Sequence, residues 1–192
     1  ILRNQIQEME NGGVVVISAP EDPYRCPPAP YERASLIADY FKKFKPKSKI
    51  IILDSKNQFT KKALFIEGWN KLYPGMIEWV SRSGGGHVNT VNPQNMTTGN
   101  DSVQLKANVI NLIPRQTASR ITIKLGLAGK DGWCEVNSFT FESRHTPYVH
   151  IIGDSINPGD MPKSAFAANS QAKAAAAAII SLVNQKELTV PV

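Results

Sequence analysis

The side chain with the clearest chemical potential is Cys26, which follows the first predicted strand and lies between Arg25 and two prolines. A nearby cation and a helix N-terminus can lower the pKa of a thiol and increase its thiolate fraction. Glu32 follows six residues later, at the start of the next predicted helix, where it could take or hold a proton. Two plain alternatives stay open: a structural cysteine in the core, and a glutamate that favours the helix dipole.

A second group of residues lies near the end of the chain, where Ile151-Ile152-Gly153-Asp154 precedes Met161-Pro162-Lys163. We predict a buried strand ending at Gly153 and Asp154, a short loop, and a helix over about 163–183. A helix N-terminus carries unpaired N–H groups and partial positive charge, so it favours electron-rich ligand atoms. Asp154 could accept hydrogen bonds from ligand hydroxyls. A flavin would satisfy both features, and an ordinary strand–loop–helix joint is the alternative.

These residues need elements that hold them, and the hydrophobic pattern predicts alternating strands and helices. Three largely aliphatic runs are typical of buried strands; they lie at residues 14–17, 50–53 and 109–113, the last with Asn111 in its middle. Apolar residues at helical spacing predict helices over 31–44 and 64–72. Residues 79–105 alternate and are interrupted by turn residues, which predicts a small antiparallel meander. The order of strands and helices predicts an α/β fold with a Rossmann-like parallel sheet.

The turn after the first strand differs from the turn of a dinucleotide-binding fold. Such a fold places G-x-G-x-x-G here, because glycines let the backbone approach a pyrophosphate. Residues 18–33 contain no glycine and five prolines, which lack N–H donors. Glu21 and Asp22 would repel phosphate in addition. We therefore predict a degenerate domain of the NAD type that binds no NAD(P) at this turn.

Composition excludes several classes of function. The chain has 192 residues, of which 42% are hydrophobic and 20% charged, and we find no apolar run close to the ~18 residues of a membrane span. Much of the net charge of +6 comes from lysines within residues 42–49, which predict a solvated turn and no nucleic-acid site. The two cysteines form no disulfide scaffold, and the three histidines show no metal-ligand spacing, so we expect no zinc site.

Several sequence runs carry a family resemblance that extends through nearly the whole chain. They are Tyr24-Arg25-Cys26-Pro27-Pro28-Ala29-Pro30-Tyr31-Glu32-Arg33, Gly68-Trp69, Tyr73-Pro74-Gly75-Met76-Ile77-Glu78-Trp79, Gly132-Trp133-Cys134 and Met161-Pro162-Lys163-Ser164. Together they resemble the flavoprotein subunit of flavocytochrome c sulfide dehydrogenase, a relative of the sulfide-quinone reductases. The first run is the most specific of them.

The resemblance implies an FAD domain, an inserted second Rossmann-like domain, a return to the FAD domain and a C-terminal interface domain. It assigns residues 1–115 to the inserted domain, with a disabled nucleotide site, and residues 116–192 to part of the FAD-binding domain. It further implies oxidation of sulfide at FAD, electron transfer to a c-type cytochrome subunit, and a periplasmic location.

Carried over position by position, the resemblance assigns roles to seven residues. Cys26 matches one half of a redox-active disulfide that faces the flavin, and Glu32 matches an acidic residue close to it. Gly153 and Asp154 match the strand end that holds the ribityl chain. Three residues match the helix opening beside the flavin pyrimidine ring, where N–H groups would stabilise negative charge on reduced flavin: Met161, Pro162 and Lys163.

The resemblance also implies that the chain is the middle and part of the end of a larger protein. The dinucleotide fingerprint and the covalent flavin attachment would precede Ile1, and the partner of Cys26 would follow Val192. Cys26 and Cys134 are therefore expected not to bond to each other, and the 192 residues alone are expected not to hold FAD or oxidise sulfide.

Two other functions stay open at this point. One is a quinone-reducing relative, which membrane-binding helices in the C-terminal region would favour. The other is a non-catalytic α/β module that docks a protein partner, and a complete protein without flavin absorbance would support it.

Overall fold

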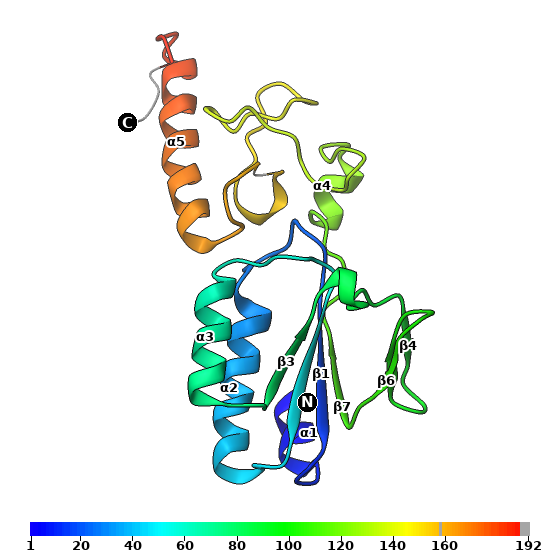
Figure 1. Cartoon of the computed structure of the whole chain (residues 1–192). Coiled ribbons are helices and arrows are strands. Elements are labelled where there is room, and N and C mark those ends of the chain that lie inside the picture. The colour runs from blue at the N-terminus through cyan, green and yellow to red at the C-terminus, as the bar shows by residue number, and fades with distance from the viewer. Residues whose placement is uncertain (158, 189–192) are drawn as a thin grey trace. The chain divides into compact units, whose positions relative to one another are not determined.

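The computed structural model describes residues 1–157 and 159–188. The chain divides into two compact units, each formed by two segments (Figure 1). The first unit contains Ile1–Asp22 and Pro27–Arg115, and the second contains Pro23–Cys26 and Gln116–Val192. The sequence prediction had placed 23–26 in the first domain; in the structure these residues pack with the second unit.

A four-stranded parallel sheet forms the centre of the first unit. Its strand order is β3-β2-β1-β7; the strands are β1 (Val14–Ala19), β2 (Lys49–Asp54), β3 (Ile77–Val80) and β7 (Val109–Leu112). Val15 pairs with Ile50 on one side and with Val109 on the other, and all three are almost fully buried. The predicted α/β class with a Rossmann-like parallel sheet is confirmed.

Three helices belong to the first unit: α1 (Leu2–Glu8), α2 (Ala29–Phe44) and α3 (Lys62–Leu72). Figure 1 shows α2 and α3 next to each other along the sheet. Tyr31 and Phe41 of α2 and Trp69 of α3 pack with the sheet residues Val15 and Ile17 in one core. Ile37 and Phe41 of the apolar stripe that predicted α2 are buried, whereas Leu36 is exposed; in α3 the buried residue is Trp69.

The opposite face of the sheet contacts a small antiparallel meander. It consists of β4 (Thr90–Asn92), β5 (Thr97–Gly99) and β6 (Gln104–Lys106). Val16 and Leu53 of the parallel sheet pack there with Leu105. The predicted meander is therefore present, but Trp79 does not belong to it, since β3 pairs in parallel with β2.

The second unit has little regular structure apart from α5 (Ala165–Val183). A short helix α4 (Arg120–Lys124) and a 3-10 turn η2 (Gly153–Ser155) complete its helical elements among the described residues. Its core is built around Trp133 and Cys134. The predicted helix over about 163–183 agrees with α5 to within two residues.

The predicted strand ending at Gly153 and Asp154 is wrong. Gly153 has a φ of +74°, a left-handed conformation, and its N–H donates to the side chain of Gln171 at 2.7 Å. Because this donor is turned toward α5, it cannot extend a strand ladder. The chain therefore turns at Gly153; before the turn His150 makes an isolated bridge to Glu142, and after it Ile156 makes one to Cys134.

By length and composition alone, α5 is the one helix among residues 1–157 and 159–188 that could cross a membrane. This helix was predicted from the sequence, but no apolar run close to the length of a membrane span was recognised in it. One face of α5 is buried in the second unit through Gln171, Ala175 and Ala178, while Phe166 and Ile180 are exposed.

Candidate functional site

The segment that carries Cys26 is joined to the rest of the second unit by hydrogen bonds from Arg25 and from Cys26 itself. The Arg25 N–H donates to Gln116 Oε1 at 3.0 Å, and the guanidinium donates to the same oxygen and to the Thr117 carbonyl. The Cys26 N–H donates to the Lys163 carbonyl oxygen at 2.9 Å. These hydrogen bonds hold the backbone of the cysteine in one place.

Cys26 is an exposed free thiol, and its φ of +53° lies in the left-handed region. A non-glycine residue in this region costs about 1–2 kcal/mol, so the neighbouring hydrogen bonds must maintain the conformation. Cys134 is also a free thiol but is buried, and burial raises its pKa. Cys26 is consequently the accessible thiol of the described chain, and Cys134 is a core residue.

Lys163 supports this region from within. Its side chain is only 4% exposed, and Nζ lies 3.5 Å from the centroid of the Trp133 ring. Nζ also donates to the backbone carbonyls of Asp154, at 3.0 Å, and of Ile156. Burial lowers the pKa of Lys163 to about 8, although the Asp154 carboxylate opposes this shift. The ammonium therefore satisfies groups of the protein interior and is not available to a ligand.

The turn at Gly153 and Asp154 is joined to α5 and to the cysteine segment. Gln171 of α5 accepts from Gly153 N–H, and its Nε2 lies 3.9 Å from the Met161 sulfur. The Asp154 carboxylate lies 3.7 Å from Arg25 Nε, and both side chains are about 40% exposed (39% and 40%). Solvent screens an ion pair of this exposure, so it orients the carboxylate without contributing much stability.

The start of α5 presents unpaired backbone donors. Ser164 caps the helix by accepting from Ala167 N–H at 3.2 Å, which leaves the N–H groups of Ala165 and Phe166 without partners inside the helix. Met161 and Pro162 precede this turn and are exposed. Donors at a helix start and an accessible carboxylate at Asp154 fit the electron-rich ring and the hydroxylated chain of a flavin.

The structure therefore brings together six of the seven predicted site residues in one unit. Cys26, Lys163 and Asp154 are linked directly by the contacts above, Gly153 and Met161 are linked through Gln171, and Pro162 lies between Met161 and Lys163 along the chain. Glu32 belongs to the first unit, where it is exposed in the first turn of α2.

Sequence reasoning missed the residues that hold the site. Arg25 was expected to activate the thiol, but its guanidinium contacts Gln116, Thr117 and Asp154 and lies over Trp133 with Cζ 5.7 Å from the ring centroid. The run Gly132-Trp133-Cys134 was noted without a role. Trp133 in this run could have indicated the site, because an aromatic ring attracts cations and both Arg25 and Lys163 lie over it.

At the carboxyl end of β2 the first unit has a buried acidic residue, Asp54. In dinucleotide-binding folds an acidic residue in this region accepts from a ribose hydroxyl. Here the carboxylate accepts from Tyr31 Oη at 2.6 Å, from Trp79 Nε1 at 2.9 Å and from Lys56 Nζ at 2.8 Å. Side chains of the protein thus take the place that a ribose would need.

Residues of the turn after β1 likewise form hydrogen bonds and an ion pair with other residues of the first unit. The Pro20 carbonyl accepts from Lys56 Nζ at 2.8 Å, and Glu21 pairs with Arg82 at 2.6 Å, a hydrogen bond that lowers the pKa of Glu21. At Gly86 a Cβ atom would fall 2.1 Å from the Val80 carbonyl oxygen, so the loop after β3 lies directly against the sheet end. Within residues 1–157 and 159–188, no group of three or more potential metal ligands gathers.

Three solved structures show the same fold. A chain of the mitochondrial ATP synthase of Tetrahymena thermophila matches 97% of this chain with a TM-score of 0.64 and 17% identity. Thioredoxin reductase of Lactococcus lactis matches 95% with a TM-score of 0.61 and 12% identity, and the HOCl-induced flavoprotein disulfide reductase of Escherichia coli matches 89% with a TM-score of 0.58 and 13% identity. This chain covers 47%, 56% and 36% of those chains, respectively. This chain therefore shares its fold with part of each of these longer chains, among them a flavoprotein disulfide reductase and a thioredoxin reductase.

The family follows from the sequence of the first unit. Residues 1–114 match the central part of the sulfide dehydrogenase (flavocytochrome c) flavoprotein chain. This match covers more than half of the 192 residues, and the chain belongs to that family. The predicted resemblance is confirmed, and so is a flavin as the cofactor class.

Proposed function

We propose that this chain is part of an FAD-dependent sulfide dehydrogenase in which Cys26 is the reacting thiol. The observation that carries the proposal is the direct hydrogen bond from the Cys26 N–H to the Lys163 carbonyl oxygen. It joins the exposed thiol to the segment that opens α5, and Lys163 in turn contacts the Gly153–Asp154 turn. Cys26 and the residues that the resemblance assigned to flavin binding therefore belong to one structural unit, whereas Glu32 belongs to the other.

The flavin would be held by the second group of residues. FAD, when bound, supplies the acceptor for the two electrons that sulfide loses on oxidation to the level of elemental sulfur. Asp154 accepts from hydroxyls of the ribityl chain, and Gly153 permits the left-handed turn that presents this carboxylate. Met161 and Pro162 lead into the first turn of α5, where free N–H groups stabilise negative charge.

Cys26 contributes a thiol that is held in place and open to solvent. A partner thiol outside residues 1–192 completes the redox-active pair, and Glu32 takes up a proton from the sulfur substrate. The electrons pass on to a c-type cytochrome subunit, and the protein works in the periplasm. The family match supports a flavoprotein of this kind, and the family's name includes the cytochrome; the periplasmic location is carried over from the family resemblance.

The experiment is anaerobic mixing of the complete protein with sulfide, followed by addition of oxidised cytochrome c or of a quinone analogue. We expect sulfide to bleach the flavin absorbance and cytochrome c to restore it. Restoration by the quinone analogue alone would favour a quinone-reducing enzyme. A complete protein that purifies without flavin would contradict the proposal and favour a non-catalytic docking module.

A further inference from the structure

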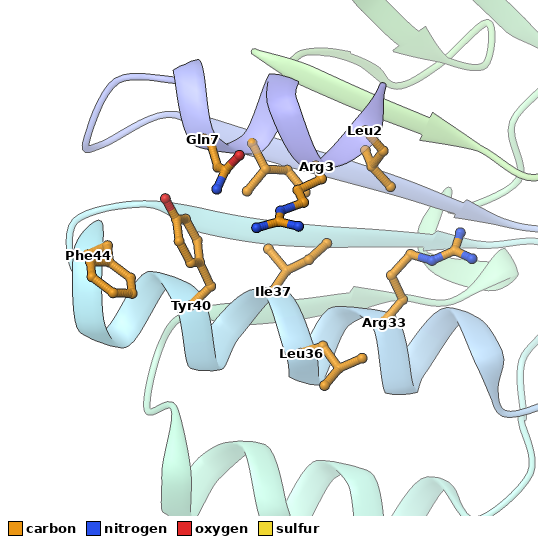
Figure 2. A pocket seen from close by; sticks show the side chains of 9 residues that line it. Leu2, Arg3, Gln7, Arg33, Leu36, Ile37, Tyr40 and Phe44 are labelled. Carbon is orange, nitrogen blue, oxygen red and sulfur yellow. The ribbon is translucent and has the colours of Figure 1, made fainter.

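A groove of about 660 Å³ runs between α1 and α2 of the first unit (Figure 2). Its volume lies within the range of ligand-binding sites, and four residues of α1 and five of α2 line it. Ile6 and Ile37 form a buried floor, whereas Leu36 and Phe44 are 75% and 65% exposed at its edge. Such an exposed apolar stripe beside a buried one is characteristic of a surface that binds another molecule.

The only charged groups among the nine lining residues are the guanidinium groups of Arg3 and Arg33. Figure 2 shows the Arg3 side chain reaching from α1 into the space above α2. Arg33 donates to Asn111 Oδ1 at 2.5 Å, while Arg3 makes no hydrogen bond or ion pair with any residue of the described chain. The groove thus combines an apolar floor with uncompensated positive charge, which is complementary to carboxylates.

The shape of the groove matches one kind of occupant. The lining positions of α2 run from Arg33 to Phe44 at helical spacing, a stripe of about 16 Å or three helical turns. A groove of this length accepts the apolar face of an amphipathic helix, whose anchors recur every three or four residues. Tyr40 and Gln7 add polar groups at the far end from Arg33 (Figure 2).

We propose that this α1–α2 groove binds an amphipathic helix of a partner protein that carries acidic residues beside its apolar face. The inference is independent of the sulfur chemistry assigned to Cys26. The neighbouring groove between α2 and α3 has no arginine in its lining; Glu32 and Asp39 line it, and Asp39 pairs with Lys43 at 2.7 Å. Leu36 borders both grooves. Of these two grooves only the α1–α2 groove has guanidinium groups in its lining, so an acidic helix should favour it.

The test uses two synthetic helical peptides with the same leucine stripe, one with glutamates and one with lysines in its first turn. Binding to the complete protein is measured by fluorescence anisotropy at low and high salt. We expect the acidic peptide to bind more tightly, and added salt to weaken its binding. Arg3→Glu should weaken the acidic peptide about fivefold and strengthen the basic one. Leu36→Ser should weaken both, because it removes an apolar contact.

Arg3 and Leu36 are exposed, so neither substitution endangers folding. Lys71→Glu on α3 is the matched control for charge and should leave both affinities unchanged. Equal affinity for the two peptides, or an effect of Lys71→Glu equal to that of Arg3→Glu, would overturn the proposal. A dimer in solution that Leu36→Ser dissociates would overturn it in favour of a second copy, and binding to anionic phosphatidylglycerol vesicles without peptide binding would overturn it in favour of a membrane.

Discussion

Lys163 acts on the candidate site from the protein interior. Its carbonyl fixes Cys26, and its ammonium bridges the carbonyls of Asp154 and Ile156 while it lies over Trp133. A lysine at the start of a helix would be expected to extend toward a ligand, but burial of the charge in this cluster requires that protein groups satisfy it. Lys163 is therefore a positioning residue for both Cys26 and the Asp154 turn.

The pKa of Lys163 gives a test of this position. Burial lowers it to about 8 in the folded protein, against 10.5 for an unperturbed lysine. Between these pH values the unfolded chain binds a proton that the folded chain does not bind, so the free energy of unfolding rises with pH. Through this effect we expect the free energy of unfolding to rise by about 3 kcal/mol between pH values of about 8 and 10.5. This rise should be absent in Lys163→Met.

This pH dependence can be measured by labelling the buried thiol of Cys134, in a Cys26→Ser protein so that no other thiol reacts. Its labelling rate in native protein, divided by the rate in urea at the same pH, measures how often the second unit opens. Lys173→Met, at an exposed position of α5, is the control and should keep the parental pH dependence. A Lys163→Met protein with the parental pH dependence would show that this ammonium is not buried.

Asp154 gives a second prediction at the residue scale. Its half-exposed carboxylate is available to a hydroxyl of the flavin, and a hydrogen bond to a charged acceptor contributes about 1.5–3 kcal/mol. In the complete protein Asp154→Ala should weaken flavin retention by roughly 10- to 150-fold, measured from free flavin after dilution and filtration. Asp160→Ala, at an exposed nearby position, should retain flavin as the parent does. Equal retention in both variants would remove Asp154 from the site.

At the scale of single elements, the end of β2 explains why no nucleotide is expected to bind at this edge of the sheet: the acidic residue there already accepts hydrogen bonds from the protein. Asp54 is fully buried and pairs with Lys56, which is itself 10% exposed, while Tyr31 and Trp79 donate to the other carboxylate oxygen. We expect no saturable binding of NADH below about 1 mM at this edge, measured by calorimetry. Tight binding that Asp54→Asn abolishes would contradict this view.

The same cluster predicts a stability effect. Asp54→Asn keeps the size of the side chain but leaves the Lys56 ammonium without its buried counter-charge, which should lower the free energy of unfolding by about 3 kcal/mol. Urea denaturation followed by far-UV circular dichroism measures it. Asp39→Asn removes the exposed pair with Lys43 on α2 and should cost less than about 1 kcal/mol. Similar losses in the two variants would mean that Asp54 is solvated.

The elements differ in how well the sequence predicts them. The strands β1 and β2 follow from continuous aliphatic runs, because a central parallel strand is buried on both faces. The edge strand β7 follows from a run that only Asn111 interrupts. Helix α1 was missed, since seven residues without a side-chain cap give little periodicity. The turn at Gly153 was read as a strand because Ile151 and Ile152 precede it, and the donor that ends the strand pairs with Gln171, which lies 18 residues away in the chain.

At the scale of the whole molecule, the second unit consists of two chain segments. Pro23–Cys26 joins Gln116–Val192, and the sequence could not show this because the contacts span about 90 residues (for Arg25 and Gln116, 91). The candidate site depends on this junction, since Cys26 lies in the short segment and Lys163 in the long one. Distance along the sequence indicates neither that these two segments pack together nor that Lys163 holds Cys26.

Arg25 tests the junction. Arg25→Ala should remove the guanidinium contacts to Gln116, Thr117 and Asp154 and so accelerate amide hydrogen exchange of Cys134 and Ile156 in the second unit. The strands of the first unit should exchange as in the parent. Arg82→Ala, which breaks the pair with Glu21, should leave the second unit unchanged. Faster exchange throughout the chain in Arg25→Ala would contradict a local role.

The central claim, that Cys26 is the reacting thiol of a sulfide-oxidising flavoprotein, is tested most directly by the rate at which sulfide bleaches the bound flavin without oxygen. The complete protein is compared with Cys26→Ser and with Cys134→Ser, in which a buried free thiol is changed instead. We predict that Cys26→Ser retains its flavin but loses sulfide-dependent bleaching, while Cys134→Ser is bleached as the parent is. Undiminished bleaching in Cys26→Ser would contradict the account.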